Sequence, residues 1–211
     1  MDDRESLESS SRARIFMTQE DAFPALGGAL IQGYIYEPNF LSDPEEAALI
    51  EQVRELPLQE AEYKQFQAKR RIHSYGGRYD FSANRLLEAE PIAPFLYPLR
   101  ERVARWTAHS ATDFAQALVA EYTPGTQLGW HRDVPHFELV VGVSLGSPCK
   151  MRFRHYPPQV RERSLAVELA PRSIYRLEGE ARWSWQHRIL PTPGLRYSIT
   201  FRTLRNPQRR S

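Results

Sequence analysis

The sequence is poor in cysteine and has no long hydrophobic run. Cys149 is the single cysteine in 211 residues, so no intramolecular disulfide can form, as is typical of proteins in a reducing compartment. No apolar stretch approaches the roughly 18 residues that a membrane-spanning helix needs. The N-terminus also lacks the apolar segment of a secretory signal. These absences favour a soluble cytoplasmic protein.

The chain also has little net charge. The 28 Lys and Arg residues nearly balance 26 Asp and Glu residues, which gives a formal net charge of +2. The distribution is uneven, because residues 61–105 hold nine basic side chains against five acids, and the tail after Phe201 holds four arginines and no acid. This local basic surface permits a polyanionic partner. An ordinary solvated surface is the alternative.

Length and composition indicate one β-rich domain. Hydrophobic residues make up 41% of the chain, and the 16 prolines and 10 tyrosines are typical of turns and half-buried strands. The polar, serine-rich start predicts a flexible lead-in over residues 1–20. We therefore expect one domain over residues 21–205 and a basic C-terminal tail over residues 206–211.

Two helices are predicted before the middle of the chain. Residues 29–36 have strand character, and a helix can then begin with Ser42 as its cap and Glu45 completing a capping box. Its apolar face continues at helical spacing until Pro57 ends it. A second helix is predicted over residues 94–107 by an apolar face made of Leu96, Leu99, Val103 and Trp106.

The hydrophobic period changes to two after residue 114. Apolar and polar side chains alternate over residues 149–154 and 165–169, whereas residues 138–145 are nearly all apolar, as in a strand buried on both faces. Two helices followed by roughly eight short strands predict an α+β domain, mainly β, whose sheet part is a sandwich or barrel.

Residues 63–81 form a basic segment interleaved with aromatic residues. Gly76 and Gly77 interrupt it, which predicts a hairpin or a mobile loop. Two interpretations stay open. The arginines and tyrosines can serve a nucleic-acid-facing lid that holds phosphates and stacks on bases, or the segment is a surface hairpin whose tyrosines pack on the core.

Two histidines and an aspartate have the pattern of a metal site. In an extended segment over residues 128–133, His131 and Asp133 point the same way. Alternation over residues 181–188 puts His187 on the same face as two tryptophans, toward the interior. Two imidazoles and one carboxylate with open coordination positions suit non-haem Fe(II), and zinc is the competing metal.

The last predicted strand carries two arginines six residues apart. Arg196, Ser198, Thr200 and Arg202 share its polar face. Arginine binds carboxylates through a two-pronged fork and stays charged, so arginines reaching inward from both ends could bracket a small dianion. An exposed edge strand with surface arginines is the alternative.

In combination these motifs resemble the AlkB-type Fe(II)/2-oxoglutarate dioxygenases. The resemblance is carried by residues 122–125 (YTPG), residues 128–133 (LGWHRD), His187 and residues 196–202 (RYSITFR). It implies a double-stranded β-helix, a jelly-roll-like core, over residues 114–204. It also implies N-terminal helices that buttress one sheet and a substrate lid over residues 61–82.

The resemblance further implies a role for each matching residue. It assigns the Fe(II) ligands to His131, Asp133 and His187. It assigns the contacts with the cosubstrate 2-oxoglutarate to Tyr122, Arg196, Ser198 and Arg202. Arg196 and the Tyr122 hydroxyl would bind the far carboxylate, and Arg202 would sit near the end that chelates iron. The second cosubstrate would be O2.

Three positions depart from the repair members of that family. Ala120 and Ser198 stand where those members usually carry asparagine, which reduces the hydrogen bonding near the chelating end of the cosubstrate. Pro135 stands where some of them have an acidic residue for a base amino group, so base recognition does not carry over, and His136 has no assigned role. The substrate-binding residues expected from the lid are Arg71, Tyr75 and Tyr79.

The function implied by the resemblance is oxidative demethylation of N-alkylated bases in DNA or RNA. Formaldehyde would be released, with succinate and CO2 as co-products. Nucleic acid is then the expected partner, and neither a membrane nor an obligate protein partner is expected. The modest net charge and Pro135 leave open the same chemistry on a protein side chain or a small molecule. A non-catalytic jelly-roll binding module is disfavoured because the ligand set is intact.

Overall fold

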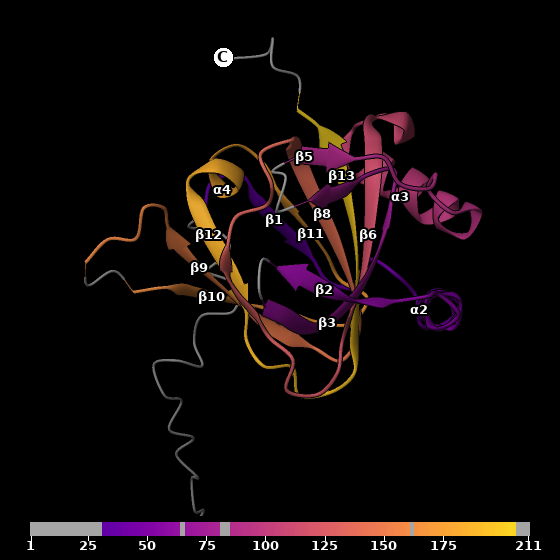
Figure 1. Ribbon diagram of the computed structural model, residues 1–211, viewed down its shortest axis with the longest axis horizontal. Helices are drawn as coiled ribbons and strands as arrows, with labels where there is room; N and C mark the ends of the chain where they lie inside the picture. Colours follow the sequence, from indigo (N-terminus) through magenta and orange to yellow (C-terminus); the bar gives the residue numbers. More distant parts are fainter. Residues whose placement is uncertain (1–30, 64–65, 81–84, 161–162, 206–211) are drawn as a thin grey trace, which may run out of the picture.

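Two antiparallel β-sheets face each other in the computed structural model, which describes residues 31–63, 66–80, 85–160 and 163–205 (Figure 1). The larger sheet has the spatial order β1 (Tyr34–Glu37), β11 (Ile174–Leu177), β8 (Phe137–Gly146), β13 (Arg196–Leu204), β6 (Phe114–Tyr122), β3 (Phe66–Tyr75), β2 (Gln59–Tyr63). The smaller sheet has the order β10 (Leu165–Leu169), β9 (Cys149–His155), β12 (Trp185–Ile189), β7 (Leu128–His131). A separate hairpin pairs β4 (Arg78–Asp80) with β5 (Arg85–Leu87).

Consecutive strands from β6 to β13 pass back and forth between the two sheets, apart from the β9–β10 hairpin. This arrangement is that of a jelly roll, and it occupies the range in which the period-two pattern predicts strands. The predicted lead-in over residues 1–20 and the predicted tail over residues 206–211 lie outside the described residues.

Two helices cover the outer face of the larger sheet (Figure 1). The first, α2 (Asp43–Arg54), begins as predicted. The Ser42 hydroxyl accepts from the Glu45 N–H at 3.4 Å, and the Glu45 carboxylate accepts from the Ser42 N–H at 2.7 Å. The helix ends at Arg54, three residues before the proline expected to stop it.

The second predicted helix is divided into a 3₁₀ turn, η1 (Pro94–Leu96), and α3 (Tyr97–Thr107). Pro98 lacks the N–H that would continue an α-helical ladder back to Pro94, which explains the change of helix type at this point. A further 3₁₀ turn, η2 (Ala111–Asp113), leads into β6.

The strands of the larger sheet separate two apolar clusters. Tyr197, Ile199 and Phe201 of β13 point outward and pack with side chains of α2 and α3. Side chains from the inner faces of the two sheets form the second cluster, which includes Met151 and Phe153 of β9. The polar face of β13 therefore looks into the space between the sheets, and not to solvent as on an exposed edge strand.

The segment predicted as a lid is in large part a strand. β3 pairs with β6 in an antiparallel register that places Ile72 opposite Ala120 and Tyr75 opposite Ala117. Tyr75 is only 3% exposed and belongs to the helix-side core. Of the two interpretations of residues 63–81, the structure thus agrees with tyrosine packing on the core at this position.

The strand expected over residues 181–188 begins later than predicted. Gly179 has a positive φ of 50°, and residues 179–183 turn into the short helix α4 (Gly179–Trp183) before β12 starts at Trp185. Trp185 shares the inner face of β12 with His187, as expected, whereas Trp183 does not, because it precedes the strand.

None of the helices in the described ranges is both long and apolar enough to cross a membrane.

Alanine substitutions at Gly76 and Gly125 test how closely the end of β3 packs against β6. Gly76 follows β3 with φ +73°, and a Cβ there would collide with the Ala115 carbonyl oxygen; Gly125 has φ +80° with nothing near its Cβ position. We expect Gly125→Ala to cost about 1–2 kcal/mol through the backbone conformation alone. Gly76→Ala should cost at least about 2 kcal/mol more, because the backbone cannot yield easily. Urea unfolding measures both, and equal losses would contradict the close approach.

Candidate active site

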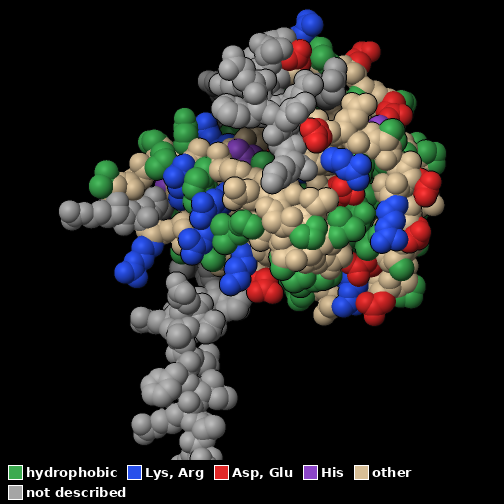
Figure 2. Space-filling model, turned by 60° about the horizontal axis from the view of Figure 1, so that its bottom comes forward, with side chains coloured by type: hydrophobic (Ala, Val, Ile, Leu, Met, Phe, Trp, Pro, Cys, Tyr) green, Lys and Arg blue, Asp and Glu red, His purple; other side chains and the backbone are tan. Residues whose placement is uncertain are grey.

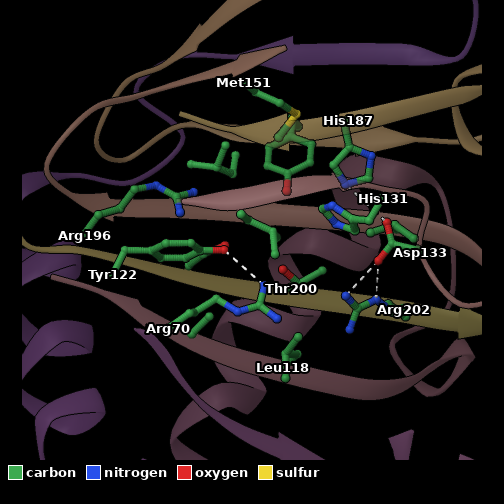
Figure 3. A pocket seen from close by; sticks show the side chains of 16 residues that line it. Arg70, Leu118, Tyr122, His131, Asp133, Met151, His187, Arg196, Thr200 and Arg202 are labelled. Carbon is green, nitrogen blue, oxygen red and sulfur yellow. Dashed lines mark hydrogen bonds and ion pairs between the residues drawn. The ribbon is translucent and has the colours of Figure 1, made fainter. Parts of the chain in front are cut away.

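A cavity between the two sheets brings the predicted site residues together (Figure 3). Its walls come from β3, β6, β8, β11 and β13 of the larger sheet and from β7, β9 and β12 of the smaller sheet. The charged and polar side chains on these walls are Arg70, Tyr122, His131, Asp133, Tyr175, His187, Arg196, Ser198, Thr200 and Arg202. The cavity has a histidine–aspartate end and an arginine–tyrosine end.

The histidine–aspartate end is assembled by strand pairing. His131 closes β7 and lies directly opposite His187 of β12, with the two ring centroids 4.3 Å apart. Asp133 follows two residues after His131, and its Oδ2 is 3.6 Å from Nε2 of His187. The side chains of His187 and Asp133 are only 9% and 8% exposed. Three residues separated by up to 56 positions thus meet at one end of the cavity, where His187 and Asp133 are nearly buried.

The two imidazoles are in the state that a metal ligand requires. The ring Nδ1 of His131 is 2.8 Å from the Gly129 carbonyl oxygen and donates to it, which leaves Nε2 as the free lone pair. Burial lowers the pKa of His131, and burial together with the neighbouring His131 lowers the pKa of His187 to about 3. Both rings are therefore neutral at physiological pH.

Asp133 remains ionised because of Arg202. Burial alone would raise the pKa of this carboxyl, but the nearby guanidinium groups, Arg202 first and Arg182 after it, help to hold that pKa well below its ordinary value. Nε and Nη2 of Arg202 donate to the same oxygen, Oδ1, at 3.2 and 2.9 Å, and Nη1 donates to Gln116 at 2.7 Å. The second oxygen, Oδ2, is the one that faces His187.

The loop after Asp133 is held from the other side by Arg182. This side chain is 2% exposed, and its Nη2 donates to the carbonyl oxygens of Val134 and Phe137 at 2.6 and 2.9 Å. Burial lowers the pKa of Arg182, and Asp133 opposes that effect. Alternation over residues 181–188 predicts that Arg182 faces outward from a strand, but the residue lies in α4 and its side chain is buried.

The donor set suits a metal ion, although the side chains do not yet close around one point. Two neutral imidazoles and one carboxylate match the ligands of a metal with open coordination positions. As the side chains stand, no three His, Cys, Asp or Glu residues in the described ranges form a group that could hold a metal ion. Binding therefore requires His131, Asp133 and His187 to turn toward a common point.

The arginine–tyrosine end contains a buried guanidinium group with an open donor. Arg196 is 1% exposed, its Nε donates to the Ser144 hydroxyl at 3.1 Å, and its Nη1 has no partner in the described part of the chain. The guanidinium carbon lies 4.9 Å from the ring centroid of Tyr122. A buried cation with an open donor is costly without a counter-charge, so this end is suited to a carboxylate.

Two small side chains face each other between the ends. Ser198 of β13 lies directly opposite Ala120 of β6, and both line the cavity. The repair members of the AlkB-type family usually carry asparagine at both positions. In this chain the same stretch of the cavity wall has one side-chain hydroxyl group and no side-chain amide.

Arg70 is a cavity residue that the sequence analysis missed. Its Nη1 donates to the Tyr122 hydroxyl at 3.3 Å, and its Nε lacks a partner in the described part of the chain. Figure 3 shows the guanidinium reaching toward the middle of the cavity. The register explains the position, because Arg71 lies opposite Glu121 and the preceding side chain therefore shares the face of Tyr122. The sequence pattern does not show which residues of β3 face the cavity, so Arg70 could not be distinguished from Arg71.

The three residues expected to bind substrate are not brought together. Arg71 points to the other face of β3 and forms an ion pair with Glu121 at 2.7 Å. Tyr75 lies in the helix-side core, so it is not accessible for stacking. Tyr79 packs against His136, with ring centroids 5.4 Å apart, and so lies beside the loop that follows Asp133. Arg71 and Tyr75 do not line the cavity.

Comparisons with known sequences identify a family and two relatives. A family model described as 2OG-Fe(II) oxygenase superfamily matches residues 33–202. A protein of Arabidopsis thaliana named alkylated DNA repair protein ALKBH8 homolog is 26% identical, over 83% of this chain and 59% of that protein. Uncharacterized protein L905 of Acanthamoeba polyphaga mimivirus is 32% identical, over 42% of this chain and 48% of its own length. The chain thus spans less than two thirds of either relative.

Solved structures share the fold. The structure of OsALKBH1 matches with a TM-score of 0.63 and 15% identity, over 81% of this chain and 98% of that chain. A prolyl-4-hydroxylase of Pseudomonas putida matches with a TM-score of 0.58 and 15% identity, over 84% and 95%. At this identity the likeness concerns the fold alone, and it confirms the predicted jelly-roll-like core.

The Arg202–Asp133 ion pair can be tested by stability. Removing Arg202 leaves a buried, unpaired carboxylate, so we expect Arg202→Met to lose about 3–5 kcal/mol in urea unfolding of the metal-free protein. Arg205→Met is the matched control, since Arg205 meets Glu138 at 3.7 Å near the surface and should lose less than about 1 kcal/mol. Adding Asp133→Asn to Arg202→Met should restore part of the loss. Additive losses in the double variant would contradict the pairing.

Proposed function

This chain belongs to the 2OG-Fe(II) oxygenase superfamily, and on that basis we propose that it oxidatively demethylates N-alkylated bases in DNA or RNA. It is an AlkB-like dioxygenase that uses Fe(II), 2-oxoglutarate and O2. The observation that carries the nucleic-acid part of the proposal is the match over 83% of the chain with a relative named for alkylated DNA repair.

In the proposed site, His131, Asp133 and His187 hold Fe(II). Bound iron and 2-oxoglutarate supply the oxidising chemistry, in which O2 is consumed, 2-oxoglutarate becomes succinate and CO2, and a C–H bond of the substrate is hydroxylated. Arg202 keeps Asp133 ionised and directs its free oxygen, Oδ2, toward His187. The Gly129 carbonyl selects the tautomer of His131 that presents Nε2.

The other end of the cavity is proposed to bind and orient 2-oxoglutarate. The open Nη1 of Arg196 and the Tyr122 hydroxyl are placed to receive its far carboxylate. Ser198 and Thr200 line the path between Arg196 and Arg202 on the same strand face. Burial of this end excludes water, which strengthens the charge–charge contact.

When an N-methyl carbon is hydroxylated, the product is an N-hydroxymethyl group. The C–N bond of that group breaks, the nitrogen keeps the electron pair and takes the hydroxyl proton, and formaldehyde leaves. This collapse needs no further redox equivalent. A methylated base therefore yields one formaldehyde for each succinate.

A second substrate class is favoured by one observation. Pro135 occupies the position from which an acidic residue would contact a base amino group in some repair members of the family. The alternative proposal is therefore hydroxylation of a protein side chain or a small molecule by the same metal and cosubstrate residues.

Turnover of methylated oligonucleotides separates these proposals. We expect anaerobically purified, Fe(II)-loaded protein to form succinate and formaldehyde in equal amounts when 2-oxoglutarate, O2 and a panel of N-methylated DNA and RNA oligonucleotides are supplied. His187→Ala should reduce turnover at least about 100-fold, because a ligand is lost. His109→Ala, which removes an imidazole that follows α3 and does not line the cavity, should keep wild-type activity.

Succinate without formaldehyde from every oligonucleotide would favour the alternative substrate class. Absence of both products from a folded, iron-loaded protein would refute the proposed enzyme activity of this site. Unchanged turnover of His187→Ala would show that His187 is not a ligand.

A further inference from the structure

The outer face of the smaller sheet is strongly basic. Side chains of β9 and β12 alternate, so that Met151, Phe153 and His187 point inward while the residues between them point outward. We define the basic face as the outward cations of these two strands together with an aromatic side chain of the neighbouring β7. Its members are Lys150, Arg152, Arg154, Arg188 and Trp130. Figure 2 shows Lys and Arg side chains gathered on the left side of the molecule, where Figure 1 shows β9, β10 and β12.

This face differs in its ion pairs from other basic parts of the described surface. Other surface arginines are paired within the fold, as in Arg71–Glu121, Arg102–Glu45 and Arg172–Asp43. In the described ranges, no ion pair involves the four cations of the basic face. Glu168 lies across from Lys150 in the β9–β10 register and is the acid nearest in register to them.

Two of the arginines oppose each other. Arg188 of β12 lies directly across from Arg152 of β9, and each has an Nε atom without a partner in the described part of the chain. Like charges directly opposite on neighbouring strands destabilise a sheet. Because no ion pair within the described ranges involves either arginine, the two guanidinium groups are open to a shared anion.

The cations are also held in place. Trp130 of β7 lies between Arg154 and Arg188, whose guanidinium carbons are 4.4 and 5.0 Å from its ring centroid. Nε of Arg154 donates to the Gln186 side chain at 2.9 Å. Arginines that rest over an indole lose less freedom when they bind an oxyanion.

The basic face lies on the same strands as the metal-binding end. His187 sits between Gln186 and Arg188 in β12, and His131 follows Trp130 in β7. The next residue, Arg132, is exposed and stacks on Tyr156 with its guanidinium carbon 3.7 Å from the ring centroid. Cations therefore continue from the outer face of the sheet toward the rim beside Asp133.

We propose that the basic face binds the phosphates of a nucleic-acid strand outside the cavity and holds that strand beside the cavity entrance. This inference rests on the proposed function, because it takes the substrate to be nucleic acid. Phosphate binding through several fixed arginines gives affinity without base sequence, and it weakens as salt rises. The bases reach the cavity while the backbone is held on the protein exterior.

The test uses an unmethylated, fluorescently labelled single-stranded oligonucleotide and its anisotropy at several salt concentrations. We expect Arg152→Glu to weaken binding at least about tenfold and to reduce the slope of log affinity against log salt by about 1–2. Its urea midpoint should stay equal or rise, because the Arg152–Arg188 repulsion becomes an attraction. Arg105→Glu has the same charge change on exposed α3 and should alter binding less than about twofold, since a distant charge is screened.

Binding of Arg152→Glu equal to that of wild type or of Arg105→Glu would overturn the inference. So would binding of anionic phospholipid vesicles, dependent on Arg152, in the absence of oligonucleotide binding. Because the assay needs no turnover, its outcome is separate from that of the demethylation assay. If binding depends on Arg152 while no oligonucleotide yields formaldehyde, the basic face stands and the proposed demethylation falls.

Discussion

The buried ion pair between Arg202 and Asp133 is the interaction on which the site depends. It connects the end of β13 with the loop after β7, two elements that the strand pairings alone do not join. Arg202 keeps the nearly buried Asp133 carboxyl charged and occupies one of its oxygens, so that the other is left for His187 and for a metal. Arg182 completes the arrangement by holding the loop that follows.

The two arginines of β13 share one strand face but differ in what they lack. Arg202 has its protein partners, Asp133 and Gln116, whereas Arg196 is more deeply buried and keeps an open donor. One arginine therefore fixes the proposed metal-binding end, and the other keeps a donor open for the carboxylate that we propose it binds. The two faces of the smaller sheet also differ, because its inner face carries imidazoles and its outer face carries arginines.

Much of this site was readable from the sequence because strands have a period of two. That period placed Arg196 and Arg202 on one face and paired His131 with Asp133, and a capping box located α2. The parity of β3 was not readable, because residues 63–81 lack a clear apolar alternation, so Arg71 was chosen and Arg70 missed. The helical turn at Gly179 requires a positive φ, which the alternation of apolar and polar residues does not indicate. The partners of Arg182 lie 48 and 45 residues away in the sequence, so the local pattern does not predict them either. Pro135 and His136 identify no substrate by themselves.

The most direct test is a crystal structure with Mn(II) in place of iron and with 2-oxoglutarate. We expect the metal to be bound by His131, His187 and Oδ2 of Asp133, while Oδ1 still accepts from Arg202, and the far carboxylate of 2-oxoglutarate to lie on Arg196. Metal bound without Asp133, or a carboxylate that leaves Arg196 without a partner, would contradict this expectation.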